Sequence, residues 1–502
     1  MLPATVRLLL ASVATSLLLL VTGYIVYLNR GPELPIWLTT ELDEEFTEET
    51  QVASFTEYLA LEDRLFAQLD REIYAKTAPA TESSFNRYQR GSLADPARWS
   101  PNWNRSFLLE RNNPHAMVLL LHGLTDAPYS LRHLGQRFHE SGATVLGLRI
   151  PGHGTAPSGL TTVSWQDMAA AVKLAMRHLA ETGEGRPIYI VGYSNGAALG
   201  IHYALSTLDN PELPRVEKLV LLSPEIGISP VAALAVWQAR VGHFLGMDKV
   251  AWDSVHSLEY EPFKYGSFAI NAAALSHEIT REIKKRVRAL SKERALGDMP
   301  PILSFASVVD ATVEATAVVE HLYNLLPEGG HQLVLFDINR QVQIEPLLTW
   351  KPDRMLAAIQ QAPHRNYTLT MVTNAGRGSA DVVARHWPEG EQGGHLQESL
   401  GLRWPKNIYS LSHVALPFPP DDSIYGGRPE GKGPGIQLGG LALRGERGAL
   451  RISAAAQLRL RWNPFYSWQE DHTVHFLNMT PSSGASPSEN LHVSERIRKH
   501  DQ

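Results

Sequence analysis

One pentapeptide, read in its local context, constrains this chain more than any other feature. Gly192-Tyr193-Ser194-Asn195-Gly196 has the spacing G-x-S-x-G, directly follows the apolar run 187–191 (PIYIV) and opens the helix-forming run AALGIHYALSTL. A strand, a sharp turn and a helix in this order expose a serine hydroxyl above the edge of a parallel sheet. Glycine at both ends of the pentapeptide permits the close backbone approach that the turn needs. The pattern predicts that Ser194 is a nucleophile.

Short apolar runs alternate with helical segments around this pentapeptide. The runs are 116–121, 143–148, 187–191, 218–222 and 301–305. Continuous apolar runs of this length are typical of strands buried on both faces of a parallel sheet. Between them, 165–181 has a helical pattern, and Ser164 and Asp167 have the spacing of a capping box. The alternation predicts an α/β fold with helices on both faces of an open, mostly parallel sheet.

Composition excludes several other chemistries. The chain contains no cysteine, which rules out disulfides, thiolate metal sites and a cysteine nucleophile. Its 46 Lys and Arg against 52 Asp and Glu give a net charge of −6, so no basic field is available to hold nucleic acid. The segment HEITR at His277 lacks the second histidine of an HExxH zinc site. We therefore expect no nucleic-acid partner.

The strand 116–121 runs into His122-Gly123-Leu124-Thr125-Asp126, which supplies a second part of a candidate site. The backbone N–H groups of Leu124 and Asn195 are expected to form an oxyanion hole, in which one donor contributes on the order of 3 kcal/mol. His122 is interpreted as structural. The alternative to an oxyanion hole is an ordinary strand-to-loop turn at Gly123.

Three segments in order carry a family resemblance. They are HGLTDAPYSLRHLGQRFHESGATVLGLRIPGHGTAPSGL, GYSNG and SFASVVDATV. Together they resemble the serine α/β-hydrolases of the monoacylglycerol lipase and carboxylesterase type, which are serine aminopeptidase S33-like. The resemblance covers residues 116–310 and resumes near His413. It implies an α/β-hydrolase fold with a helical cap after the sixth strand, ester-type substrates, no metal and no organic cofactor.

The family order along the chain is serine, acid, histidine. Asp310 follows the strand candidate 301–307 and precedes a helical run, so its carboxylate is expected at the same sheet edge as Ser194. There it would orient the imidazole and stabilise its cation. Asp337, just after the apolar run QLVLF, is the alternative acid.

His413 is the predicted general base. It follows the apolar-rich NIYSLS and precedes VALPFPP, whose prolines end any regular element. His331 precedes a strand candidate and would therefore lie at the opposite sheet edge. His364 and His395 are the remaining candidates, and neither directly follows a strand candidate.

The N-terminal segment 8–28 contains no charged residue, and its 21 residues are close to the about 20 that span a bilayer as a helix. It predicts an uncleaved, single-pass signal anchor with the catalytic domain on the exported side, periplasmic or extracellular. A cleaved signal peptide and a buried core helix are the alternatives.

The rest of the chain is expected to form one catalytic domain with extensions. The predicted parts are an anchor at 1–30, a helical extension at 31–107, a catalytic domain at 108–430 and a C-terminal extension at 431–502 with a disordered end. The catalytic domain includes a cap at about 225–300 and an insertion at about 338–405 that loops out. The acidic run 41–49 is interpreted as a solvated linker, 55–73 as a helix covering the domain, and the C-terminal extension as packed strands.

These observations predict a membrane-anchored serine hydrolase that cleaves carboxylic esters of small-molecule or lipid-like substrates through Ser194, His413 and Asp310. A peptidase or thioesterase on the same residues remains an alternative, because the triad alone does not select a leaving group. A membrane-tethered binding protein without turnover is the alternative from another class. The sequence carries no signal for oligomeric state.

Overall fold

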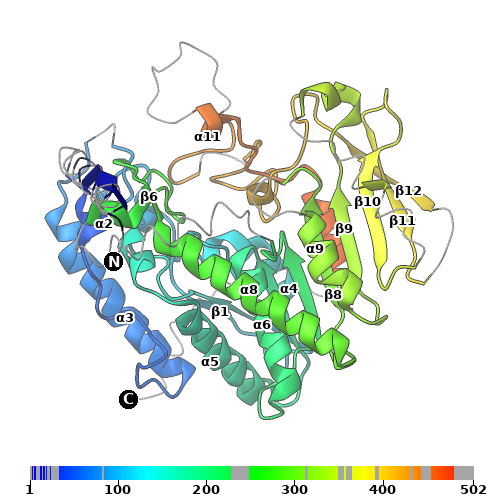
Figure 1. Cartoon of the computed structure of the whole chain (residues 1–502), viewed down its shortest axis with the longest axis horizontal. Coiled ribbons are helices and arrows are strands. Elements are labelled where there is room, and N and C mark those ends of the chain that lie inside the picture. Colours follow the sequence, from blue (N-terminus) through cyan, green and yellow to red (C-terminus); the bar gives the residue numbers. More distant parts are fainter. Residues whose placement is uncertain are drawn as a thin grey trace.

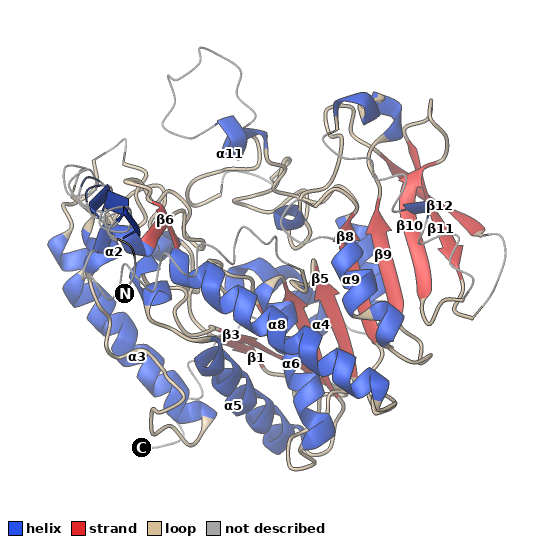
Figure 2. Ribbon diagram, in the orientation of Figure 1, coloured by secondary structure: helices blue, strands red, loops and turns tan. Residues whose placement is uncertain are grey.

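The apolar runs of the sequence become neighbouring strands of one sheet (Figure 1). The computed structural model describes residues 33–81, 84–227, 248–310, 315–348, 364–390, 395–429, 433–441 and 454–479, together with Leu356, Ala357 and scattered residues between 3 and 23. Helices lie on both faces of the sheet (Figure 2). The predicted α/β architecture is confirmed.

Ten strands form the main sheet in the order β1-β3-β2-β4-β5-β8-β9-β10-β11-β12. They are β1 (Phe107–Leu109), β2 (Met117–Leu121), β3 (Thr144–Leu148), β4 (Ile188–Tyr193), β5 (Lys218–Leu222), β8 (Ile302–Ser307), β9 (Gln332–Phe336), β10 (Thr368–Asn374), β11 (Asp381–Trp387) and β12 (Leu396–Arg403). Neighbours from β3 to β10 are parallel, whereas β1 with β3, β10 with β11, and β11 with β12 are antiparallel. A separate pair, β6 (Trp252–Ser254) and β7 (Phe268–Ala269), lies between β5 and β8 in sequence.

Alternate residues of each strand face two separate apolar cores. Met117, Leu119 and Leu121 belong to one core, and Val118 and Leu120 belong to the other. The first core contains residues of α2 (Ile36–Thr39), α3 (Phe55–Glu72), α5 (Trp165–Gly183), α6 (Asn195–Asp209), α8 (Ile270–Lys292) and α9 (Ala315–His321). The second contains residues of α4 (Arg132–Glu140) and α12 (Tyr466–Phe476). Burial on both faces explains the unbroken apolar runs.

Helix α5 begins where the sequence predicts. The Ser164 side chain accepts from the Asp167 N–H at 3.1 Å, and the Asp167 carboxylate accepts from the Ser164 N–H at 2.8 Å. These two bonds satisfy N–H groups that have no partner within the helix.

The N-terminal extension packs on the first core through α3, as expected, but the acidic run is not simply a solvated linker. Glu45 forms a bidentate pair with the buried guanidinium of Arg149, at 2.9 and 3.0 Å. Glu62 of α3 accepts from Arg149 Nε at 3.1 Å, and the Tyr58 hydroxyl donates to the Arg149 carbonyl at 2.6 Å. The interpretation of 41–49 as a linker is therefore wrong at Glu45, because the buried guanidinium of Arg149 needs its carboxylate.

The segment after β9 does not loop out as predicted. Strand β10 pairs in parallel with β9, and β11 and β12 extend the sheet as an antiparallel meander. The reason is that β9 would otherwise leave a free row of backbone donors and acceptors at the sheet edge.

The C-terminal extension is also different from its prediction. Its described part contains two helices, α11 (Ala454–Leu458) and α12, in place of packed strands. Tyr466, Val474 and Phe476 of α12 are buried in the second core. The end expected to be disordered, 480–502, lies outside the described residues.

The predicted membrane span 8–28 lies largely outside the described residues, as does part of the cap at 228–247. Among the residues that the structure does describe, no helix combines the length and hydropathy needed to cross a bilayer.

Asp422 ties the chain beyond His413 to the second face of the sheet. Its fully buried carboxylate accepts from Arg132 Nη2 at 2.7 Å and from the backbone N–H groups of Ile424 and Tyr425 at 2.8 and 2.7 Å. His133 Nε2 lies 3.0 Å away. Burial alone would raise the pKa of this carboxyl, but the Arg132 cation and the His133 contact hold it well below its usual range.

We expect Asp422→Asn to lower the free energy of unfolding by about 3–5 kcal/mol near neutral pH, because Arg132 then stays buried without its anion. The stability that a depressed folded-state pKa contributes is fully present above the unfolded-state pKa of about 3.9. It is lost progressively as the pH falls from that value toward the folded-state pKa. In urea titrations, the difference in free energy of unfolding between wild type and variant should therefore decrease by about 1 kcal/mol from about pH 5 to pH 3. A difference that increases on acidification would contradict this assignment.

Candidate active site

Ser194 occupies a strained turn between β4 and α6. Its φ of 54° and ψ of −114° lie in a region that non-glycine residues rarely adopt. Its N–H donates to the Leu222 carbonyl at the end of β5, at 2.9 Å. A Cβ on Gly196 would lie 2.1 Å from the Leu121 carbonyl oxygen, so only glycine fits there. The serine predicted as nucleophile is thus at the carboxyl edge of the sheet and at the N-terminus of α6.

Two backbone donors face no acceptor near this turn. Within the described part of the chain, the N–H groups of Leu124 and Asn195 donate to no protein acceptor. Asn195 is the first residue of α6, where the helix dipole adds partial positive charge. These are the two groups predicted as the oxyanion hole.

His122 holds the backbone beside Leu124. Its Nε2 accepts from the Ile150 N–H at 3.1 Å, so Nδ1 carries the proton and donates to the Gly123 carbonyl at 2.9 Å. Burial depresses the pKa of His122 well below its usual value, which keeps the ring neutral. These contacts agree with a structural role.

Asp310 and His413 lie in direct contact although 103 residues separate them in sequence. His413 Nδ1 is 3.1 Å from Asp310 Oδ1, and the carboxylate side chain is almost fully buried. Asp310 follows β8, and His413 begins a short 3₁₀ turn, η9 (His413–Ala415). An aspartate on Nδ1 fixes the imidazole so that Nε2 has the free lone pair.

The structure does not bring Ser194 and His413 into hydrogen-bond contact. Among the described residues, the Ser194 hydroxyl has no hydrogen-bond partner, and the group next to His413 Nε2 is the Arg459 guanidinium, at 3.1 Å. In the absence of substrate, catalytic hydrogen bonds are often long or unformed. Ser194 follows β4 and Asp310 follows β8, so both lie at the carboxyl edge of the sheet, with β5 between their strands.

The competing candidates are engaged elsewhere. The Asp337 carboxylate pairs with Arg340 at 2.8 Å and accepts from the Thr373 hydroxyl at 2.7 Å. His331 Nδ1 accepts from the Ile302 N–H at the start of β8, which is the opposite sheet edge.

Several charged groups around the site carry no sequence signal. Glu225, three residues after β5, is buried, and its N–H donates to the Ser194 carbonyl at 3.3 Å. Burial raises the pKa of Glu225 above its usual value. Lys264 pairs with Asp126 at 3.1 Å, beside the loop that carries Leu124. Charged side chains in irregular segments have no periodicity from which such pairing could be predicted.

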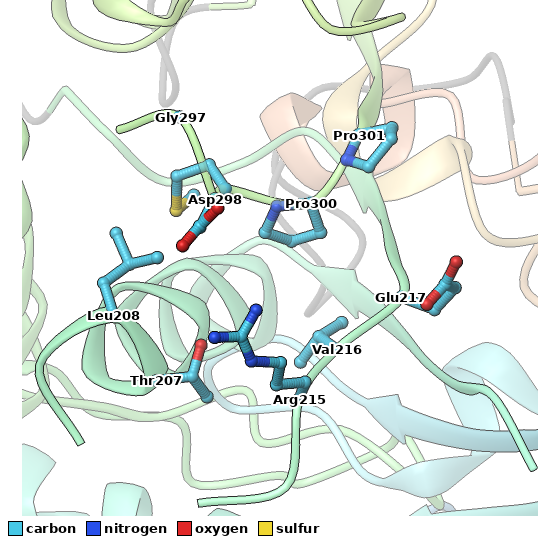
Figure 3. Close-up of a pocket in the computed structure, with 10 residues that line it drawn as sticks. Thr207, Leu208, Arg215, Val216, Glu217, Gly297, Asp298, Pro300 and Pro301 are labelled. Carbon is cyan, nitrogen blue, oxygen red and sulfur yellow. The ribbon is translucent and has the colours of Figure 1, made fainter. Parts of the chain in front are cut away.

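A separate pocket of about 270 Å³ lies far from this chemistry (Figure 3). Its lining includes Thr207 at the end of α6, Glu217 just before β5 and Pro301 just before β8. It therefore opens at the amino edge of the sheet, opposite Ser194.

Comparison with known proteins agrees with this fold. The family model of serine aminopeptidase, S33, matches residues 112–327, which include Ser194 and Asp310 but end before His413. The chain is 32% identical over 87 residues to a thermostable monoacylglycerol lipase of Bacillus sp. (strain H-257), covering 17% of this chain and 34% of that protein. The predicted resemblance to α/β-hydrolases of the monoacylglycerol lipase type is confirmed.

Two further matches are more distant. An uncharacterized abhydrolase domain-containing protein of Dictyostelium discoideum is 23% identical over 272 residues, covering 50% of this chain and 28% of that protein. The matches thus span about a third of the length of these two relatives. A solved metagenome-derived lipolytic enzyme is 21% identical with a TM-score of 0.36, covering 51% of this chain and 98% of that one.

Proposed function

We propose that this chain, an α/β-hydrolase similar to monoacylglycerol lipases, cleaves carboxylic esters through an acyl-enzyme on Ser194. The observation that carries the proposal is the strained turn of Ser194 at the same sheet edge as the Asp310–His413 pair. Strained backbone that positions a serine at a helix N-terminus is costly, and such strain clusters at active sites.

In the proposed reaction, His413 Nε2 takes the proton of the Ser194 hydroxyl as the oxygen attacks the ester carbonyl. His413 then gives that proton to the leaving alcohol oxygen, and the same two steps with water release the acid. Asp310 stabilises the imidazolium without taking its proton.

The developing oxyanion would be held by the N–H groups of Leu124 and Asn195. Both donors are backbone groups fixed by neighbouring structure, so they need no rearrangement as charge develops. Gly123 keeps this loop close to the nucleophile, because a Cβ there would lie 2.9 Å from the Tyr193 ring.

We further propose that segment 8–28 anchors the protein in a membrane as a single span and that the catalytic domain lies on the exported side. The support is the 21-residue stretch without charge. Protease protection in membrane vesicles tests the orientation. A protease should cleave the catalytic domain when it has access to the exported face of the membrane, and not when it has access only to the other face.

Hydrolysis of 4-nitrophenyl esters of increasing acyl length tests the reaction and reports the acyl preference. We expect turnover by the wild type and a loss of at least about 10⁴-fold in kcat for Ser194→Ala. Ser206→Ala, on the same helix α6 with its hydroxyl bonded to the His202 carbonyl at 2.8 Å, serves as the matched control. A wild type no faster than Ser194→Ala would support the non-catalytic binding protein.

Peptide hydrolysis is the second candidate, since the family model is that of a serine aminopeptidase. Aminoacyl 4-nitroanilides distinguish the two: a kcat/KM for an anilide above that for the matching ester would favour the peptidase.

A further inference from the structure

Arg459 lies against the proposed general base. It directly follows α11, and Figure 2 shows α11 above the sheet edge toward which β8 and β9 point. Its Nη2 is 3.1 Å from His413 Nε2 and 3.3 Å from His413 Nδ1, and its Nε is 3.3 Å from the Ser412 hydroxyl. The side chain is exposed.

Among the described residues, Arg459 has no carboxylate partner, unlike the other cations near the site. Arg461, two residues later, pairs with Glu261 at 2.8 Å, and Lys264 pairs with Asp126 at 3.1 Å. Within the described part of the chain, no carboxylate lies within 4.0 Å of the Arg459 guanidinium. This cation beside His413 is therefore available to pair with an anion of a bound molecule.

Its present position opposes the proposed reaction. Nη2 is nearly equidistant from the two nitrogens of His413, so the guanidinium lies over the face of the imidazole ring. A positive charge there opposes the positive charge that develops on the ring as it takes the proton of Ser194. An anion that paired with Arg459 would offset this effect.

We infer that Arg459 is a specificity-determining residue and that the substrate is an ester that also carries a carboxylate. This inference rests on the proposed function. The planar guanidinium binds carboxylates through two parallel hydrogen bonds, which a neutral acyl chain cannot replace. Binding of the carboxylate to Arg459 places a negative charge beside the cation and offsets its effect on His413.

Two substrate pairs test this inference. Each pair has one carboxylate and one uncharged member: mono-4-nitrophenyl adipate with 4-nitrophenyl hexanoate, and 3-acetoxybenzoate with 3-acetoxybenzamide. The first pair places the anion on the acyl side and the second on the alcohol side. The ratio of kcat/KM between members is measured for wild type, Arg459→Gln and Arg459→Lys, with thermal melting to verify folding.

We expect the wild type to prefer the carboxylate member of at least one pair and Arg459→Gln to lower that ratio about 10- to 100-fold, the range for a charge-assisted hydrogen bond. Arg459→Lys should keep part of the preference as a point charge. Arg403→Gln is the control, since Arg403 is exposed on the outer strand β12. Added salt should reduce the wild-type ratio.

Equal ratios in wild type and Arg459→Gln for both pairs would overturn the inference. An increase of both values of kcat/KM by the same factor in Arg459→Gln would also overturn it, because the guanidinium would then slow the reaction without selecting the substrate. In either case, turnover of the uncharged esters would leave the proposed function standing. Absence of turnover for every ester would instead overturn the proposed function and this inference with it.

Discussion

Replacing His413 by alanine is expected to lower kcat for ester hydrolysis by about 10⁴-fold or more, the largest effect predicted for a single side chain other than Ser194. His413 Nε2 is the proposed acceptor of the Ser194 proton, and its contact with Asp310 at 3.1 Å sets its orientation. The measurement is steady-state kinetics with a 4-nitrophenyl ester, together with a melting curve for each variant.

His364 and His395 provide matched controls for this prediction. His364 Nε2 lies 3.2 Å from Glu328 on an exposed surface, and the His395 ring packs against Trp387 at the outer end of the sheet. Alanine at either position should change kcat by no more than about 3-fold, because neither ring contacts the proposed site. Full activity in His413→Ala together with loss in one of the other two would refute the assignment.

Removing the Arg149 guanidinium is expected to cause a large loss of stability. Arg149→Met leaves Glu62 buried without its cation and frees Glu45, which joins the N-terminal extension to the hydrolase domain. Breaking a buried pair from one side costs about 3–5 kcal/mol. Urea unfolding near neutral pH, followed by circular dichroism, measures the change.

Arg64→Met is the control for this second prediction. Arg64 pairs with Glu44 at 3.0 Å, but both side chains are largely exposed, and such pairs contribute about 0–1 kcal/mol. If Arg149→Met lost no more stability than Arg64→Met, the extension would not be fastened through this cluster.

The core of the fold could be predicted because its local and long-range signals agree. Five apolar runs became β2, β3, β4, β5 and β8, since burial on both faces makes these strands almost entirely apolar. The capping box of Ser164 and Asp167 located the start of α5 for the same reason of local consistency.

The parts that sequence reasoning missed depend on contacts between distant segments. In α12, the buried face includes the polar residues Gln469 and Thr473, so the apolar residues alone showed no periodicity that indicates a helix. Strand β12 is largely exposed, and its pairing with β11 is set by the free edge of the sheet rather than by its own apolar residues. In the sequence, Glu45 is one of several acidic residues in 41–49, and only the fold places it beside Arg149.

The candidate site likewise contains residues that the sequence predicts and one that it does not. Ser194 has a local signature, and Asp310 and His413 could be chosen from their positions after strand candidates and from the family order. Arg459 could not, because nothing in LRLRW distinguishes the arginine that contacts His413 from Arg461, which pairs with Glu261.

The central claim is that Ser194 is an activated nucleophile, and covalent labelling tests it most directly. The full-length protein is treated with a fluorophosphonate, digested and analysed by mass spectrometry, beside Ser194→Ala and His413→Ala. We predict a phosphonyl adduct on the peptide that contains Ser194 in the wild type, none in Ser194→Ala and a strongly slowed reaction in His413→Ala. An unlabelled wild type, or an adduct on another residue, would contradict the claim.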